Sequence, residues 1–134
     1  MYLKEAIKVL NESGYSVLKE NEAICKASYF SDFIDDTNTV NVEVYLKKND
    51  GSDFTQDDTG FIYDIYEKIV DELGINPPYK DGVLTDAMYD GYNDGEDYIA
   101  KLDFFFDGDR FNETQAKEYI AKALTSQNIT AVED

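Results

Sequence analysis

The sequence predicts a single α+β domain, in which a mostly antiparallel sheet of about five or six strands carries three helices. Three observations support this prediction. Apolar and polar residues alternate in segment 40–48, as they do in a half-buried strand. Apolar residues recur at helical spacing in three other segments. Short, turn-rich connections separate these segments. Neighbouring strands are therefore expected to pair with each other, and the helices are expected to cover one face of the sheet.

Helical spacing first occurs near the start of the chain, at Leu3, Ala6, Ile7 and Leu10. Gly14 stands where a helix commonly ends in a left-handed cap, so we expect a helix over residues 2–12. Residues 15–18 and 23–30 look extended. The clearest strand is 40–48, whose apolar side is formed by Val40, Val42, Val44 and Leu46.

A second helix is expected over residues 57–73, closed by Gly74. Its apolar face is formed by Ile62, Ile65, Tyr66, Ile69, Val70 and Leu73. Pro77 and Pro78 follow, and they favour a stiff, extended connection at which the chain changes direction.

The last third of the chain predicts a hairpin, a helix and an edge strand. The hairpin arms are expected at 83–89 and 97–106, on either side of a loop at 90–96 that contains two glycines. Asn112 is suited to cap the helix, with Gln115 three residues later as in a capping box. Residues 129–132 could add an edge strand.

Composition places the chain among folded proteins with a one-domain core. Its 134 residues fit one domain, and 43% hydrophobic with 14% aromatic residues is too much apolar surface for a disordered acidic tail. Cys25 has no partner for an internal disulfide, and MYLKEAIKVL lacks the apolar core of a signal peptide. No window approaches the length of a membrane span. We therefore expect a soluble, cytoplasmic protein.

The negative charge is concentrated in the middle of the chain. The formal net charge is −17, and residues 49–110 hold 17 acidic and 4 basic side chains, a net charge of −13. A field of this sign repels nucleic-acid phosphates and anionic lipids, and it attracts basic partners. Direct binding to nucleic acid or to a membrane is therefore not expected.

One candidate binding feature is a row of carboxylates on the second expected helix. Asp57, Asp64 and Asp71 repeat every seven residues, with Glu67 between them, on the side opposite the apolar face. The helical rise places the last three about 5 to 6 Å apart along the axis. This is close to the spacing of successive phosphates on a nucleic-acid strand. The row, here called the acidic ridge, could imitate such phosphates.

A second candidate feature is the predicted hairpin loop, where carboxylates and tyrosines interleave: Asp86, Tyr89, Asp90, Tyr92, Asp94, Glu96, Asp97 and Tyr98. Tyrosine gives rigid contact area at low entropy cost, and the acids would select arginine or lysine on a partner. Tyr89 and Tyr92 are the expected contact rings. The alternative for both features is a merely solvated acidic surface that keeps the protein soluble.

Catalytic and metal chemistry find little support in the sequence. The chain has no histidine and a single cysteine, which removes the commonest general base and most zinc or iron sites. Phosphate-binding glycine loops are missing, and the Asp-Gly segments at Asp90 and Asp103 fail the EF-hand spacing. Two carboxylates could serve a glycosidase, but 29 acidic residues make such a pair expected by chance. We expect no enzyme activity, cofactor or metal.

The chain resembles the small acidic anti-defence proteins of bacteriophages, of the anti-CRISPR and DNA-mimic type. The resemblance lies in MYLKEAIKVLNESGYSV at the start, in the lack of His and Trp, and in the acidic ridge and loop. It implies an inhibitor that occupies a basic, nucleic-acid-binding groove of a defence nuclease in the host cytoplasm. Two alternatives stay open: an immunity protein against a basic toxin, and a phage structural or assembly protein whose acidity serves solubility.

Overall fold

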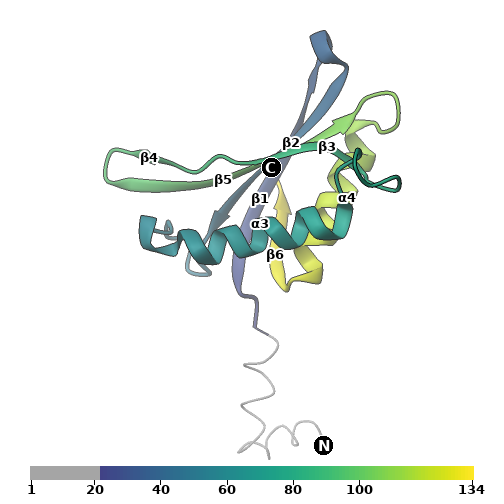
Figure 1. Ribbon diagram of the computed structural model, residues 1–134. Coiled ribbons are helices and arrows are strands. Elements are labelled where there is room, and N and C mark those ends of the chain that lie inside the picture. Colours follow the sequence, from purple (N-terminus) through teal and green to yellow (C-terminus); the bar gives the residue numbers. More distant parts are fainter. Residues whose placement is uncertain (1–21) are drawn as a thin grey trace, which may run out of the picture.

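The computed structural model describes residues 22–134, which form one sheet with two α-helices (Figure 1). In chain order the elements are β1 Cys25–Ile34, β2 Thr39–Lys47, α3 Thr59–Leu73, β3 Leu84–Tyr89, β4 Tyr92–Asp94, β5 Asp97–Asp107, α4 Glu113–Ser126 and β6 Ile129–Glu133. Short 3-10 turns at Asp35–Thr37 and Gln56–Asp58 precede β2 and α3.

The sheet is mixed, with the strand order β3-β5-β2-β1-β6. All neighbouring strands pair antiparallel except β1 and β6, which are parallel. Helix α3 connects the parallel strands β2 and β3 across β5, and α4 connects β5 to β6 across β2 and β1. The chain from β2 to β6 therefore contains two split β-α-β units. Strand β5 lies between β2 and β3 of the first unit, and strands β2 and β1 lie between β5 and β6 of the second.

The core lies between the helices and one face of the sheet. Val40, Val42 and Val44 of β2 stand in register with Phe106, Phe104 and Leu102 of β5, and all six side chains are buried. The helices complete this core with Ile62, Ile65, Ile69 and Leu73 from α3 and with Ala116, Ile120, Ala123 and Leu124 from α4. Strand alternation and helical periodicity place these apolar side chains on the faces that meet. Burial of each large one stabilises the fold by about 1.5 to 3 kcal/mol.

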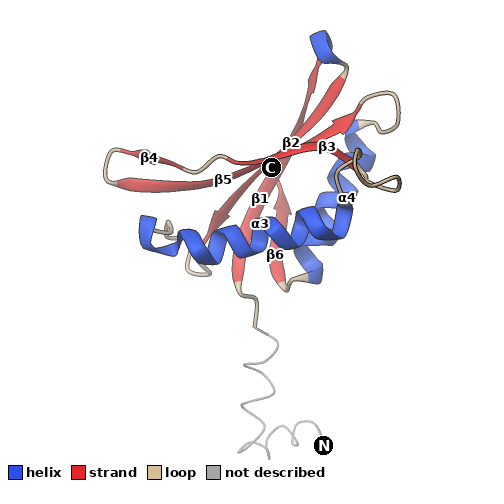
Figure 2. Ribbon diagram, in the orientation of Figure 1, coloured by secondary structure: helices blue, strands red, loops and turns tan. Residues whose placement is uncertain are grey.

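No helix in the described part of the chain covers the opposite face of the sheet (Figure 2). Strand alternation directs Asn41, Glu43 and Tyr45 of β2 to that face, together with Lys101 and Asp103 of β5. We call this surface the helix-free face.

Several sequence predictions are confirmed. Segment 40–48 is β2, the tail is the edge strand β6, and α3 fills most of the expected 57–73 helix. The capping box is present, because Asn112 Oδ1 accepts from the Gln115 amide at 2.8 Å and Gln115 Oε1 accepts from the Asn112 amide at 3.0 Å.

The described residues hold two α-helices rather than three. The sheet is mostly antiparallel, as expected, with one parallel pair between β1 and β6. The expected helix over 2–12 and the extended segment 15–18 lie outside the described residues. From Cys25 onwards, the expected 23–30 segment forms the first part of the longer strand β1, which continues to Ile34.

The predicted loop at 90–96 is wrong in its structure. Strand β4 lies within it and extends the hairpin along β5, so only Gly95 and Glu96 form the turn. Gly95 has φ 67°, which is the left-handed backbone that the first position of a two-residue hairpin turn requires. Gly91 accommodates the rings of Tyr89 and Tyr98, because a Cβ there would lie 2.2 Å from the Tyr98 hydroxyl and 2.6 Å from the Tyr89 ring.

Candidate functional site

The acidic ridge is exposed on the side of α3 that faces away from the sheet. Asp64, Glu67 and Asp71 are exposed, whereas the core residues of α3 point the opposite way. Asp57 is also exposed, but it lies in the 3-10 turn before α3, because the α-helix begins only at Thr59. The ridge therefore spans two elements, and its first carboxylate does not follow the α-helical rise.

The carboxylates of the ridge have no ion-pair partner within residues 22–134. The ion pairs of this region involve Lys47, Lys101 and Lys117 with acids elsewhere. Lys68 is the single basic residue of α3, and it pairs with none of the ridge acids. No basic residue of the described part of the chain therefore neutralises the field of the ridge by an ion pair.

Two aromatic rings flank the ridge. Phe61 is 40% exposed and packs against Phe54 with ring centroids 5.6 Å apart. Tyr63 is 47% exposed and lies 5.6 Å from Tyr66 and 6.2 Å from Tyr89 by the same measure. Sequence reasoning missed both rings, although each is a large residue beside the apolar face of the helix. They add contact area next to the charges.

Tyr89 is half-buried beneath this surface rather than presented on it. Its hydroxyl shares a 2.6 Å hydrogen bond with that of Tyr98, which is itself buried. Burial and this hydrogen bond raise the pKa of Tyr89 well above its ordinary value. Tyr89 therefore packs between the sheet and α3, against Tyr63 and Tyr66 of the helix. Its role as a contact ring for a partner stays a prediction.

Asp86 and Glu67 lie on different elements near Tyr66, Asp86 on the edge strand β3 and Glu67 on α3. Burial is the main cause that raises the pKa of Tyr66, followed by Tyr63, Asp86 and Glu67. Both carboxylates thus act on one hydroxyl, although one belongs to the edge strand and the other to the helix. Asp86 is exposed on the edge strand, and no hydrogen bond or ion pair among the described residues joins it to the acidic ridge.

Three other predicted acids, Asp94, Glu96 and Asp97, lie at the tip of the β4–β5 hairpin. This hairpin extends beyond the helix layer in Figure 1. Asp94, Glu96 and Asp97 are exposed at its tip, and Tyr92 is exposed on β4. Asp94 pairs directly with Asp97 across the turn, so two like charges face each other. By strand alternation Tyr92 shares a face with Ile99 and Lys101, which is the helix-free face. The structure therefore separates this group from the ridge.

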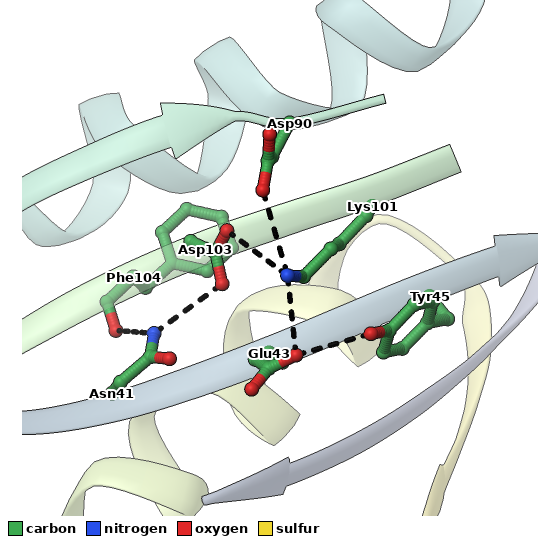
Figure 3. A network of polar contacts seen from close by, with 7 residues as sticks. All are labelled: Asn41, Glu43, Tyr45, Asp90, Lys101, Asp103 and Phe104. Carbon is green, nitrogen blue, oxygen red and sulfur yellow. Dashed lines mark hydrogen bonds and ion pairs between the residues drawn. The ribbon is translucent and has the colours of Figure 1, made fainter. Parts of the chain in front are cut away.

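Asp90 belongs to a third arrangement, a polar network around Lys101 on the helix-free face (Figure 3). Lys101 Nζ lies 3.4 Å from Glu43, 3.5 Å from Asp90 and 3.7 Å from Asp103. The Tyr45 hydroxyl donates to Glu43 at 3.0 Å, and Asn41 Nδ2 donates to Asp103 at 3.4 Å and to the Phe104 carbonyl at 3.3 Å.

The network is partly removed from water, and this changes its proton affinities. Asp103 is 5% exposed, and burial raises its pKa, against the opposing effects of Lys101 and Asn41. Burial alone would lower the pKa of Lys101, but Asp103 and Glu43 raise it above its ordinary value. Lys101 is therefore held as a cation between three carboxylates. Sequence patterns do not reveal the network, because its residues meet only when β2 and the connection between β3 and β4 pair with β5.

Metal and membrane features are not seen in the described residues. No group of His, Cys, Asp and Glu side chains within 22–134 is arranged to hold a metal ion. None of the helices described here is long and apolar enough to cross a membrane. Cys25 is buried, and desolvation raises the pKa of its thiol to about 11, so it is held as the unreactive thiol.

The fold and the exposed charges define an α+β protein with a mixed six-stranded sheet and an acidic helix on one side. Comparison of the chain with protein-family models, with curated proteins and with solved structures found no match.

Proposed function

We propose that the chain is a non-enzymatic inhibitor that binds a basic, nucleic-acid-binding surface of a partner protein, in the manner of a phage anti-CRISPR protein or DNA mimic. The observation that carries this proposal is the acidic ridge: Asp57, Asp64, Glu67 and Asp71 are exposed and make no ion pair within the described residues. Carboxylates in such a row can take the place of phosphates before lysine and arginine side chains.

The support of the ridge by the core makes it suitable for binding. Ile62, Ile65 and Ile69 of α3 are fully or almost fully buried, so the helix that carries the charges is held rigidly. A rigid row of charges loses little conformational freedom on association, which favours affinity. Phe61 and Tyr63 supply apolar contact beside the charges, where interface hot spots are enriched in aromatic rings.

The decisive experiment compares three forms of the full chain in a quantitative pull-down. The ridge variant carries D57N, D64N, E67Q and D71N. The control variant carries D32N, D35N, D36N and E118Q, which alters the net charge equally at exposed positions away from the ridge. We expect the control to retain the partner captured by the original chain and the ridge variant to lose it. Equal capture by both variants would contradict the proposal.

The nature of the captured partner separates this function from its alternatives. A labelled nucleic acid is first bound to the purified partner, and the chain is then titrated into the complex. Displacement of the nucleic acid supports the inhibitor. A partner with toxin activity but no nucleic acid to displace supports an immunity protein instead. Defined homo-oligomers that tolerate the ridge substitutions support a structural or assembly protein.

A further inference from the structure

An open cavity of about 420 Å³ lies at the C-terminal end of α3, between that helix and the loop over residues 75–82. The loop folds back on itself, because the Tyr79 amide donates to Ile75 at 3.1 Å and the Gly82 amide donates to Tyr79 at 3.0 Å. Gly82 allows this close packing, since a Cβ there would lie 2.7 Å from the backbone of Ile75 and Asn76. The tight packing gives the cavity a fixed wall.

The cavity has an apolar lining and an acidic rim. Val70, Leu73 and Pro78 contribute apolar lining, and the carboxylate residues that line it are Asp71, Glu72 and Asp81. None of these three acids is ion-paired with a described basic residue. Glu72 accepts a 3.0 Å hydrogen bond from Ser126, which leaves other lone pairs of its carboxylate free.

The end of the helix adds further negative potential to the cavity. The last turn of α3 contains Asp71 and Glu72 and no basic residue, although helix C-termini favour cations. The carbonyls of Asp71 and Glu72 also accept no backbone hydrogen bond from the residues that follow the helix, because Gly74 donates to Val70 and Asn76 donates to Leu84. Backbone carbonyls and carboxylates therefore gather at this end of α3 with no ion-pair partner among residues 22–134.

An exposed ring lines this cavity. Tyr79 is 66% exposed, which is the largest exposure among the large apolar and aromatic side chains of the described chain. A cation placed over such a ring gains cation–π attraction. Lys80 is adjacent in sequence, but it does not line the cavity.

We propose that this cavity, the α3 cavity, binds an arginine side chain of the partner. Its apolar lining suits the methylene stem, the carbonyls and carboxylates suit the planar donors of guanidinium, and Tyr79 offers a face for stacking. The inference rests on the proposed function, because it names the side chain through which a basic partner engages one end of the ridge. Asp71 belongs to both features.

The test uses ¹⁵N-labelled full-length protein and three short probes: acetyl-Gly-Arg-Gly-amide, the same peptide with lysine, and the same peptide with neutral citrulline. The amide signals of Gly74 and Gly82 are followed by NMR during titration. We expect saturable shifts with the arginine peptide, weaker affinity for the lysine peptide and no saturable binding of the citrulline peptide. Equal effects of arginine and citrulline, or shifts confined to the hairpin tip, would overturn the inference.

A cavity variant can be made without changing any of the four ridge acids. Tyr79→Ala with Asp81→Asn is expected to weaken arginine-peptide binding about tenfold or more, since a charge-assisted contact and a stacking contact are both lost. Asp32→Asn with Asp36→Asn serves as the control and is expected to leave the affinity unchanged, because both residues are exposed and neither lines the cavity. Signal dispersion in the NMR spectrum checks that each variant is folded. A cavity variant that binds like the original chain would refute an arginine site.

Two further arms separate the possible outcomes. Magnesium or calcium chloride at the peptide concentration should not reproduce the shifts, and a divalent ion that did so would replace the arginine site with a metal site. Peptide binding at the cavity, combined with full partner binding by the ridge variant, would sustain this inference while the proposed function fails. The reverse result would refute the cavity alone.

Discussion

The hydroxyls of Tyr89 and Tyr98 share a 2.6 Å hydrogen bond that joins β3 to β5 directly under α3. Tyr98 is buried, and Tyr89 packs against Tyr63 and Tyr66 of the helix. The helix that carries the acidic ridge is thus fixed to the edge strand through tyrosines. Several measurements can test how this support and the neighbouring charges affect stability and binding.

Removal of one of the two hydroxyls should destabilise the fold. Tyr98→Phe leaves the Tyr89 hydroxyl without its partner in a half-buried position, so we expect a loss of about 1 kcal/mol in the free energy of unfolding. Urea denaturation followed by circular dichroism measures the change. Tyr92→Phe is the control, because Tyr92 is exposed. Equal stabilities of the two variants would contradict a structural role for the hydrogen bond.

The tyrosines also predict how stability depends on alkaline pH. The pKa values of Tyr45, Tyr66 and Tyr89 are raised in the folded protein, mainly by burial. The unfolded chain loses these protons near pH 10, whereas the folded chain keeps them, so unfolding becomes easier as the pH rises. Stability should be constant through neutral pH and fall progressively above about pH 10. Denaturation curves that did not change between pH 8 and pH 11 would refute this assignment.

The polar network depends on its single cation. Lys101→Met leaves Glu43 and Asp103 partly buried without a positive partner, and we expect a loss of about 2 to 4 kcal/mol. Burial already raises the pKa of Asp103, and loss of Lys101 should raise it further. The variant should therefore recover stability as the pH falls and the folded state takes up this proton.

A control variant checks that reasoning. Asp103→Asn combined with Lys101→Met removes the titrating carboxyl, so the recovery at lower pH should become smaller. Thermal unfolding between pH 5 and pH 8 measures both variants. Recovery of the same size in the two would show that another group is responsible.

The tip of the hairpin should be easy to stabilise. Asp94 and Asp97 are paired across the turn, and like charges in such a pair repel each other. Asp97→Lys should therefore raise the free energy of unfolding by about 0.5 kcal/mol at low salt, with a smaller gain at high salt. Asp32→Lys at another exposed strand position controls for the general effect of lowering the net charge.

Association with a basic partner should be fast and sensitive to salt. Exposed charges are screened beyond about 8 Å at physiological ionic strength, so the association rate should fall steeply as salt is added. Surface plasmon resonance at several salt concentrations measures this dependence. The ridge variant should show a shallower slope, and an affinity that barely changed with salt would contradict mimicry of nucleic acid.

Local patterns predicted the elements that depend on neighbouring residues in the chain. The alternation from Val40 to Leu46 and the capping pair of Asn112 with Gln115 each operate within a few residues, and both predictions are confirmed. The predicted extent of the loop, 90–96, is wrong because the sequence does not distinguish the roles of Gly91 and Gly95. Only Gly95 lies in the turn, whereas Gly91 accommodates the close approach of Tyr98, which the tertiary pairing creates.

The sequence by itself determined the acidity, its concentration in residues 49–110 and the position of the ridge opposite an apolar helix face. Only the tertiary structure determined which of these acids form ion pairs and which remain available to bind a basic partner. Asp90 is drawn to Lys101, whereas Asp64 and Asp71 remain without a cation among the described residues. The physical reason is that helical spacing is local, whereas ion pairs and the α3 cavity arise between segments that only folding brings together.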